Sequence, residues 1–482
     1  MRRRSRVSLL AMVITVGILT TGCISGGASD NTANNEPTTA APLTTTASSG
    51  DTGSTDGSAA GSPAGSPASQ QSTAPALKPT GTIEVVSFYP AGSADYKRLQ
   101  ATAARFEATY PGTTVKLIFG GGENTPKIQA RWRAGNPPEV NYGFFDGTTQ
   151  DGRKYATAGQ VQALDKWLDA PLQGYDSSWR DAIYPSVIPY ISLNDKTYAA
   201  PESISTIQLF YNKKIFADQG ISVPKTLDDL LAAAAKIKAA GISPFALTGT
   251  FNPYMQLWFD YLLLRRAGAK AVQGALTGTT NFASVPGVKE AAADLEKMIK
   301  AGYFMEGFQS TDFTAAQLDF FQGKSAMIMM GSWLLGEMKG SIPADFEVGT
   351  FAFPSISGGT GDETAVFGGV NGQVVATQSK NPAGGVAWLQ FIAQKSNQDA
   401  FVKDTGQISA YTGVAAPAGF QDVVDRLDKP DAFVPSYFGV LGAGKPVSDG
   451  YEKPIAELFF GKKTAAQMVA AIDGNLRAAN GG

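Results

Sequence analysis

Few side chains in this sequence are suited to catalytic chemistry. The chain has 482 residues, no histidine and one cysteine, Cys23, but 42 acidic residues. Without histidine, neither a Ser-His-Asp triad nor a Cys-His pair can form, and a metal site built from carboxylates would suit Ca²⁺ rather than Zn²⁺. A pair of carboxylates is all that a glycoside hydrolase needs, so a secreted enzyme of that class stays the alternative. We expect no catalytic residue, no metal and no cofactor.

The segment 439–446, GVLGAGKP, imitates a phosphate-binding loop through Gly444 and Lys445. Pro446 stands where such a loop needs Ser or Thr to hold Mg²⁺. We therefore reject a nucleotide-binding function for this segment.

Cys23 follows a stretch with the layout of a secretion signal. The basic MRRRSR precedes an apolar run, 7–19, that is shorter than the ~20 residues of a membrane-spanning helix. LTTGC then resembles the lipobox of bacterial lipoproteins, although Thr20 replaces the usual Leu, Val or Ile. We expect a signal peptide over 1–22 and lipidation at Cys23, as by palmitate. A plain signal peptide with an incidental cysteine is the alternative.

The composition changes after the cysteine. Residues 23–80 consist largely of Ser, Thr, Gly, Ala and Pro without an aromatic residue, so this segment is expected to be a flexible tether. Without the four arginines of the leader, the formal charge of −2 becomes −6, which argues against nucleic acid as a partner. These features predict a protein on the extracellular face of the cell membrane, held by its lipid anchor only.

The remaining ~400 residues are enough for two domains and alternate between strand and helix patterns. β-Branched and aromatic runs predict strands, and apolar spacings of three, four and seven predict helices. Thr226 and Asp229 form a capping-box pattern, and Gly241 marks the helix end. The expected strands are 82–89, 113–119, 139–145, 242–249, 324–333 and 372–377, and the expected helices are 93–112, 126–135, 225–241 and 464–480. This alternation predicts an α/β fold.

Ligand contacts in α/β sheets gather at the carboxyl ends of strands. Tyr89 ends the first expected strand and Asp146 follows the third, so both are candidates. Packing at the rim for Tyr89 and a turn or cap role for Asp146 are the alternatives. Glu123 and Asn124, in the Gly-rich loop GGGENT, are weaker candidates because such a loop needs no ligand to explain it.

The order of motifs resembles the extracellular solute-binding proteins of ABC importers, in particular the large sugar-binding family that includes the maltose-binding protein. The resemblance runs from about residue 82 to the C-terminus. Five segments carry it in the order of the family: 106–117, 134–140, 196–230, 323–333 and 367–392.

The resemblance implies a fold of two α/β lobes joined by crossover strands, with the ligand cleft between them. Carried over to this chain, it gives lobe 1 as 81–203 plus 373–406, lobe 2 as 204–366 plus 412–482, and hinges near 202–206, 367–372 and 407–411. Ligand would bridge the lobes and favour the closed form.

The resemblance also implies which side chains contact a sugar. Trp333, after the turn Gly331-Ser332, matches an aromatic residue that stacks on the ligand, because sugar C–H faces pack on flat rings. Glu202 lies in the first crossover, and Gly369 and Asn371 lie in the second. Further aromatic candidates are Trp258, Tyr411 and Tyr437, for which core packing or a surface position is the alternative.

The function implied is that of a monomeric carbohydrate receptor, not an enzyme, that delivers a mono- or oligosaccharide to the permease subunits of an ABC importer. Besides the hydrolase, a sugar-sensing or adhesive lipoprotein without a transport role is the alternative.

Overall fold

The computed structural model describes residues 77–87, 94–120, 124–143, 151–429, 433–442 and 444–481. Cys23, the expected signal peptide and nearly all of the expected tether lie outside these residues. In the described part of the chain, no helix combines the length and the apolar character that crossing a membrane requires.

The first half of the fold is a parallel sheet covered by helices. Strand β1 pairs in parallel with β2 on one side and with β3 on the other, so the chain must cross over between them through helices. The elements are β1 (Gly81–Ser87), α1 (Ala94–Thr109), β2 (Thr113–Phe119), α2 (Asn124–Arg133) and β3 (Val140–Gly143). They confirm the βαβαβ order that the sequence predicts.

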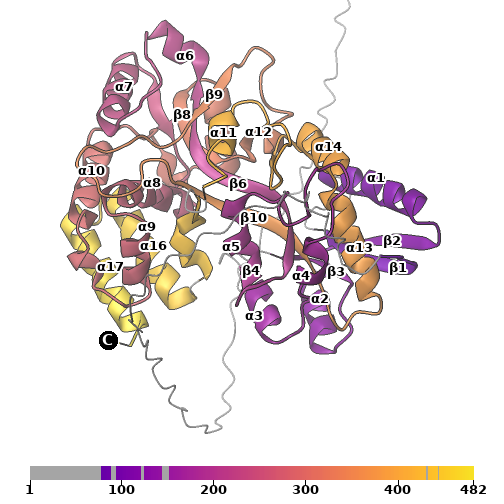
Figure 1. Cartoon of the computed structure of the whole chain (residues 1–482). Helices are drawn as coiled ribbons and strands as arrows, with labels where there is room; N and C mark the ends of the chain where they lie inside the picture. The colour runs from indigo at the N-terminus through magenta and orange to yellow at the C-terminus, as the bar shows by residue number, and fades with distance from the viewer. Residues whose placement is uncertain are drawn as a thin grey trace, which may run out of the picture. The chain divides into compact units, whose positions relative to one another are not determined.

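Two long strands, β6 (Ala199–Asn212) and β10 (Val366–Val375), lie side by side at the centre of the fold (Figure 1). They pair antiparallel, from Thr206 opposite Gly368 to Ala199 opposite Val374. β10 also pairs with β3, whereas β6 from Ile207 onward pairs with β8 (Ser325–Gly331). The resulting order is β2-β1-β3-β10-β6-β8-β7, so these two strands join the two halves of the sheet.

Helices surround the second half of the sheet. Its strands are β7 (Ser243–Ala246), parallel to β8, and β9 (Val348–Phe351). In α7 (Leu227–Ala239), Thr226 and Asp229 form the predicted capping box, and Gly241 follows the helix with a φ of 78°. The other long helices are α8 (Asn252–Arg266), α10 (Val288–Lys300), α11 (Phe313–Phe321), α16 (Lys445–Phe459) and α17 (Ala465–Ala479).

The remaining elements are short or complete the first half. The helices are α3 (Asp151–Thr157), α4 (Asp165–Leu168), α5 (Ile188–Ile191), α6 (Lys213–Asp218), α9 (Ala269–Leu276), α12 (Leu334–Glu337), α13 (Pro382–Ala393), α14 (Lys395–Thr405) and α15 (Gln421–Val424). The strands are β4 (Ser192–Leu193), β5 (Lys196–Thr197), β11 (Ile408–Ser409) and β12 (Phe433–Pro435). The predicted α/β fold with two lobes is confirmed. The lobe boundaries stay a prediction; each expected hinge range falls on or overlaps β6, β10 or β11.

Among the residues that the structure describes, one carboxyl group of the second half is completely buried and forms no ion pair. Asp260 of α8 is completely buried; it accepts hydrogen bonds from the Tyr451 hydroxyl at 2.7 Å and from the Gln256 amide at 2.9 Å. Burial raises the pKa of Asp260 to about 8, and these two hydrogen bonds offset only part of that rise. Asp260 is therefore largely protonated in the folded protein at pH 7.

A raised carboxyl pKa predicts that stability falls as pH rises. Between the unfolded pKa of about 3.9 and the folded pKa of about 8, Asp260 is ionised in the unfolded state but protonated in the folded state. The free energy of unfolding therefore falls by up to about 1.4 kcal/mol for each pH unit of increase in this range. Urea unfolding of the wild type from pH 5 to 8 is expected to show this slope, and Asp260→Asn to reduce it. The exposed Asp345→Asn is the control, and equal slopes in the wild type and Asp260→Asn would contradict the prediction.

Candidate functional site

Aromatic side chains meet where two parallel strands end. β7 and β8 run in the same direction, so their carboxyl ends lie at one edge of the sheet. The chain after β8 places Trp333 there, and the chain after β7 leads to Tyr254 in the first turn of α8. The Trp333 indole lies close enough to the Tyr254 hydroxyl to lower the pKa of that hydroxyl. This pair is the centre of the candidate site.

The turn that carries Trp333 is fixed to the crossover strand β6. The backbone N–H of Ser332 donates to the carbonyl of Thr206 at 2.8 Å, and the N–H of Thr206 donates to the Ser332 hydroxyl at 3.2 Å. Both residues are buried, so this reciprocal pair is shielded from water. Trp333 is thereby held at the point where β6 changes its pairing from β10 to β8.

Gly331 provides the surface on which the Trp333 ring lies. A Cβ atom at position 331 would overlap the six-membered ring of the Trp333 indole. The indole can therefore fold back over the end of β8 only because residue 331 has no side chain.

Trp333 is the one tryptophan that keeps a partly exposed ring. All six tryptophans of the chain are among the described residues, and the other five are buried. A half-exposed indole on a fixed turn offers a flat apolar face to a ligand.

Polar groups surround this aromatic pair. Burial raises the pKa of Tyr254 far above its ordinary value, and the neighbouring Tyr437 hydroxyl and Glu337 carboxylate raise it further. Tyr254 therefore stays a neutral hydroxyl that can donate or accept hydrogen bonds. Tyr437 and Phe438 both have left-handed backbone conformations, with φ of 58° and 50°. Such conformations cost energy in residues with a side chain and tend to occur at functional sites.

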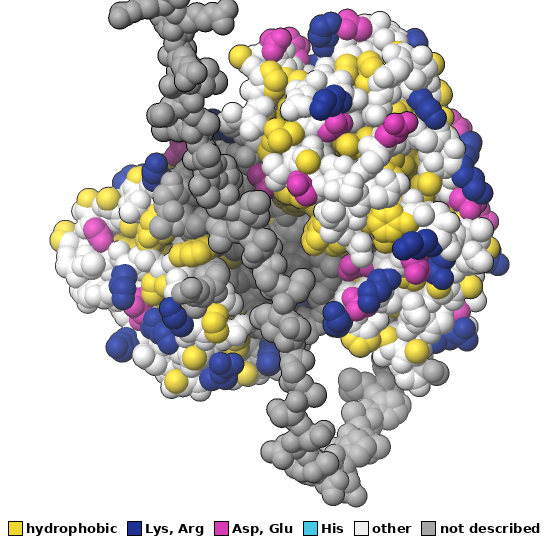
Figure 2. Space-filling view, turned by 180° about the vertical axis from the view of Figure 1, so that it is seen from behind, with side chains coloured by type: hydrophobic (Ala, Val, Ile, Leu, Met, Phe, Trp, Pro, Cys, Tyr) yellow, Lys and Arg dark blue, Asp and Glu magenta, His cyan; other side chains and the backbone are white. Residues whose placement is uncertain are grey.

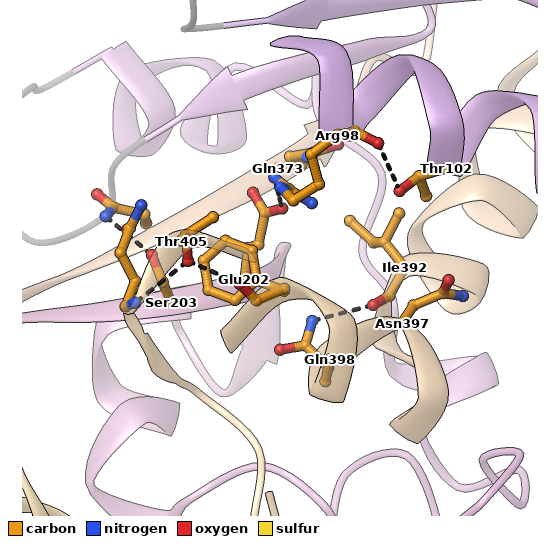
Figure 3. A network of polar contacts seen from close by, with 12 residues as sticks. Arg98, Thr102, Glu202, Ser203, Gln373, Ile392, Asn397, Gln398 and Thr405 are labelled. Atoms are coloured by element: carbon orange, nitrogen blue, oxygen red, sulfur yellow. Dashed lines mark hydrogen bonds and ion pairs between the residues drawn. The ribbon is translucent and has the colours of Figure 1, made fainter. Parts of the chain in front are cut away.

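The crossover candidate Glu202 takes part in a buried ion pair (Figure 3). Its carboxylate lies 2.9 Å from the Arg98 guanidinium of α1, and the two side chains are 5% and 9% exposed. The guanidinium also lies over the Phe401 ring of α14, 4.8 Å from its centroid. Burial raises the pKa of the neighbouring Asp95; Arg98 lowers that pKa and the charge of Glu202 raises it. Glu202 thus links α1 to the crossover strand, a role that its sequence position did not reveal.

The two candidates on β10 face β6. The Asn371 amide donates to the Ser203 hydroxyl at 3.0 Å, and the Gly369 carbonyl accepts from the Ser205 hydroxyl at 3.2 Å. Asn371 and Ser205 are half-buried, whereas Gly369 is buried. Both contacts hold the crossover strands together.

Two aromatic candidates, Trp258 and Tyr411, lie in the core, in agreement with the alternative that they serve core packing. Trp258 is completely buried and packs on Phe245 and Phe304, with ring centroids 4.5 and 5.1 Å away. Tyr411 is also completely buried, and its hydroxyl accepts a hydrogen bond from the Trp179 indole at 3.2 Å. The apolar neighbours of each residue come from distant parts of the sequence, so local patterns did not reveal this burial. We leave both out of the proposed site.

Three candidates, Tyr89, Glu123 and Asp146, lie outside the described residues. Sequence analysis missed Tyr254, although a tyrosine just beyond the strand 243–246 fits the rule that it applied to Tyr89. Among the described residues, no group of three or more acidic or cysteine side chains is arranged to hold a metal ion.

The contact between Gly331 and Trp333 leads to a prediction. Gly331→Ala is expected to displace the indole and cost about 1–3 kcal/mol of stability, as overpacking does. Tryptophan emission should shift, because the other five indoles are buried and unaffected, and chemical unfolding measures the stability. Gly340→Ala is the control, since its Cβ would meet no atom within 4 Å. An unchanged emission spectrum in Gly331→Ala would contradict this description of the Trp333 ring.

Comparison with known proteins shows which family the chain belongs to. A probable sugar-binding periplasmic protein of Mesorhizobium japonicum is 26% identical over 378 residues, which cover 74% of this chain and 85% of that protein. An uncharacterized ABC transporter extracellular-binding protein of Pyrococcus horikoshii is 28% identical over 355 residues, 70% of this chain and 74% of that protein. The solved structure of a chitin oligosaccharide binding protein has a TM-score of 0.64 and 25% identity, covering 83% of this chain and 98% of the other.

The sequence model that describes bacterial extracellular solute-binding proteins matches residues 90–399, well over half of the chain. The match includes β6, β8, β10 and the aromatic pair Trp333 and Tyr254. The protein therefore belongs to the family of bacterial extracellular solute-binding proteins.

Proposed function

We propose that this protein is the carbohydrate receptor of an ABC importer. It captures a neutral mono- or oligosaccharide and presents it to the permease subunits of the transporter. Its relatives are named as binding proteins, among them a sugar-binding and a chitin oligosaccharide binding protein, and this favours a receptor over a hydrolase.

The observation that carries the proposal is the half-exposed Trp333 ring at the edge of β7 and β8. Pyranose rings present apolar C–H faces that stack on such a ring, and their hydroxyls need donors and acceptors around it. Tyr254 and Glu337 supply those polar groups beside the indole. On the face shown in Figure 2, acidic and basic side chains are interspersed rather than gathered by sign.

Delivery to a permease would depend on lobe movement. β6 and β10 connect the two halves of the sheet, so bending within them would bring the Trp333 edge toward the first half. A sugar that contacts both halves would shift the population toward the closed form. Expected candidates on the first half are Tyr89, Glu123 and Asp146.

Sugar binding is tested by titrating the purified protein with a panel of mono- and oligosaccharides, followed by tryptophan fluorescence and calorimetry. Trp333→Leu is expected to weaken binding about two- to tenfold, because it removes the stacking face worth roughly 0.5–1.5 kcal/mol beyond its buried area. Trp333→Phe keeps a flat ring and should retain much of the affinity. Absence of saturable binding throughout the panel would contradict the proposal, and recovery of shortened sugars would favour the hydrolase.

We also propose that the protein is held on the extracellular face of the cell membrane by lipid on Cys23, because LTTGC follows a short signal-like segment. We propose that it acts there as a monomer. Cys23→Ala is expected to move the protein from the membrane fraction of its cell to the soluble fraction. Fractionation with immunoblotting measures this, and Ser25→Ala is the control. An unchanged membrane fraction in Cys23→Ala would contradict lipid anchoring at this residue.

A further inference from the structure

The ladder between the two crossover strands stops one pair early. β6 and β10 pair as far as Thr206 opposite Gly368, so Ile207 and Phe367 would form the next pair. Antiparallel ladders alternate between pairs that exchange backbone hydrogen bonds and pairs that do not. The N–H and the carbonyl of Thr206 both bond to Ser332 and not to β10. A regular ladder would therefore continue with direct hydrogen bonds between Ile207 and Phe367.

The Tyr261 hydroxyl of α8 lies between these two residues instead. It donates to the carbonyl of Ile207 and accepts from the backbone N–H of Phe367 at 3.2 Å, so one side-chain oxygen bridges the two strands. All three residues are completely buried, and water does not compete for these hydrogen bonds. Burial raises the pKa of Tyr261 to about 12, so the hydroxyl keeps the proton that it donates.

The Tyr261 ring is fixed in this position by its neighbours. It stacks on Phe353, with the ring centroids 5.0 Å apart and the planes 9° from parallel, and Phe367 packs edge-on at 4.8 Å. The Arg265 guanidinium, one turn later in α8, lies 5.6 Å from the Tyr261 ring centroid and donates to the Phe353 carbonyl at 2.9 Å. The hydroxyl is therefore held between the strands.

The same helix carries part of the candidate site. Tyr254, in the first turn of α8, precedes Tyr261 by seven residues, so the two side chains share one helix face about 10 Å apart along the axis. The turn before Trp333 is attached at the same point of the crossover, because Ser332 bonds to Thr206. Two separate contacts, one through α8 and one through this turn, thus connect the candidate site to the crossover strands.

We infer that Tyr261 is a positioning residue whose hydroxyl replaces one hydrogen-bonded pair of the crossover ladder and thereby fixes the candidate site to the strands that join the two halves. Bending between the halves is then confined to the parts of β6 and β10 that pair with each other, 199–206 and 368–374. The second half moves as one body, and its site keeps one geometry. A hydroxyl that served core packing alone would affect stability but not ligand affinity.

Amide hydrogen exchange of the ligand-free protein tests the bridge. Tyr261→Phe removes only the hydroxyl, and the Phe367 amide is expected to exchange at least about tenfold faster, because local opening there becomes easier. Tyr451→Phe is the matched control. It also removes the hydroxyl of a completely buried tyrosine in the second half, but that hydroxyl bonds to Asp260 and not to a crossover strand. Unchanged exchange at Phe367 in Tyr261→Phe would overturn the inference.

Calorimetric titration tests the positioning role, and this part rests on the proposed carbohydrate function. The probe is whichever of maltotriose, chitotriose and xylotriose binds the wild type most tightly. Tyr261→Phe is expected to weaken binding about threefold or more, because a smaller fraction of the molecules then holds the site in its binding geometry. Tyr451→Phe should bind like the wild type, and urea unfolding shows how much stability each variant loses.

The outcomes separate the inference from the function on which it rests. Equal affinity losses in the two variants, or an unchanged affinity in Tyr261→Phe, would reject the positioning role and leave the carbohydrate receptor intact. Failure of all three sugars to bind the wild type would instead count against the carbohydrate function, and the exchange rate of the Phe367 amide would still decide whether Tyr261 fixes the crossover.

Discussion

The antiparallel pairing of β6 with β10 is the interaction on which the rest of this structure depends. It joins a parallel sheet formed by the N-terminal strands to a second sheet formed by β7, β8 and β9. Side-chain contacts at Ser203 and Ser205 add to the backbone ladder. Any movement of one half against the other must therefore be accommodated within these strands or the short β11 beside them.

The same pairing determines where the aromatic site lies. β6 leaves β10 at Thr206, and the next residue already pairs with the end of β8. Because Thr206 and Ser332 exchange hydrogen bonds there, the turn before Trp333 is attached to the crossover strand itself. On the other side of the fold, the Arg98–Glu202 ion pair attaches α1 to the same strand only four residues earlier in the sequence. Forces at either attachment therefore act on one short stretch of β6.

The sequence predicted the features that depend only on residues close together in the chain, such as helix caps and strands. The α7 capping box needs only Thr226 and Asp229, three residues apart, so the sequence reveals it directly. The strand before Trp333 is similarly evident from its composition. The roles of the candidate site residues depend instead on contacts between distant parts of the chain. Nothing near Glu202 in the sequence reveals Arg98, 104 positions away, as its partner, and Trp258 is buried by rings from three separate segments.

The places where the chain departs from local preference are informative because they gather in one region. Phe251 occupies the N-cap position of α8 in place of a capping residue, and Tyr437 adopts a left-handed conformation. Both lie near Tyr254, one by ring contact and the other by the electrostatic effect of its hydroxyl. Folding alone would favour a capping side chain and an ordinary backbone at these positions. Their clustering beside Tyr254 is what we expect where selection for ligand contact outweighs selection for stability.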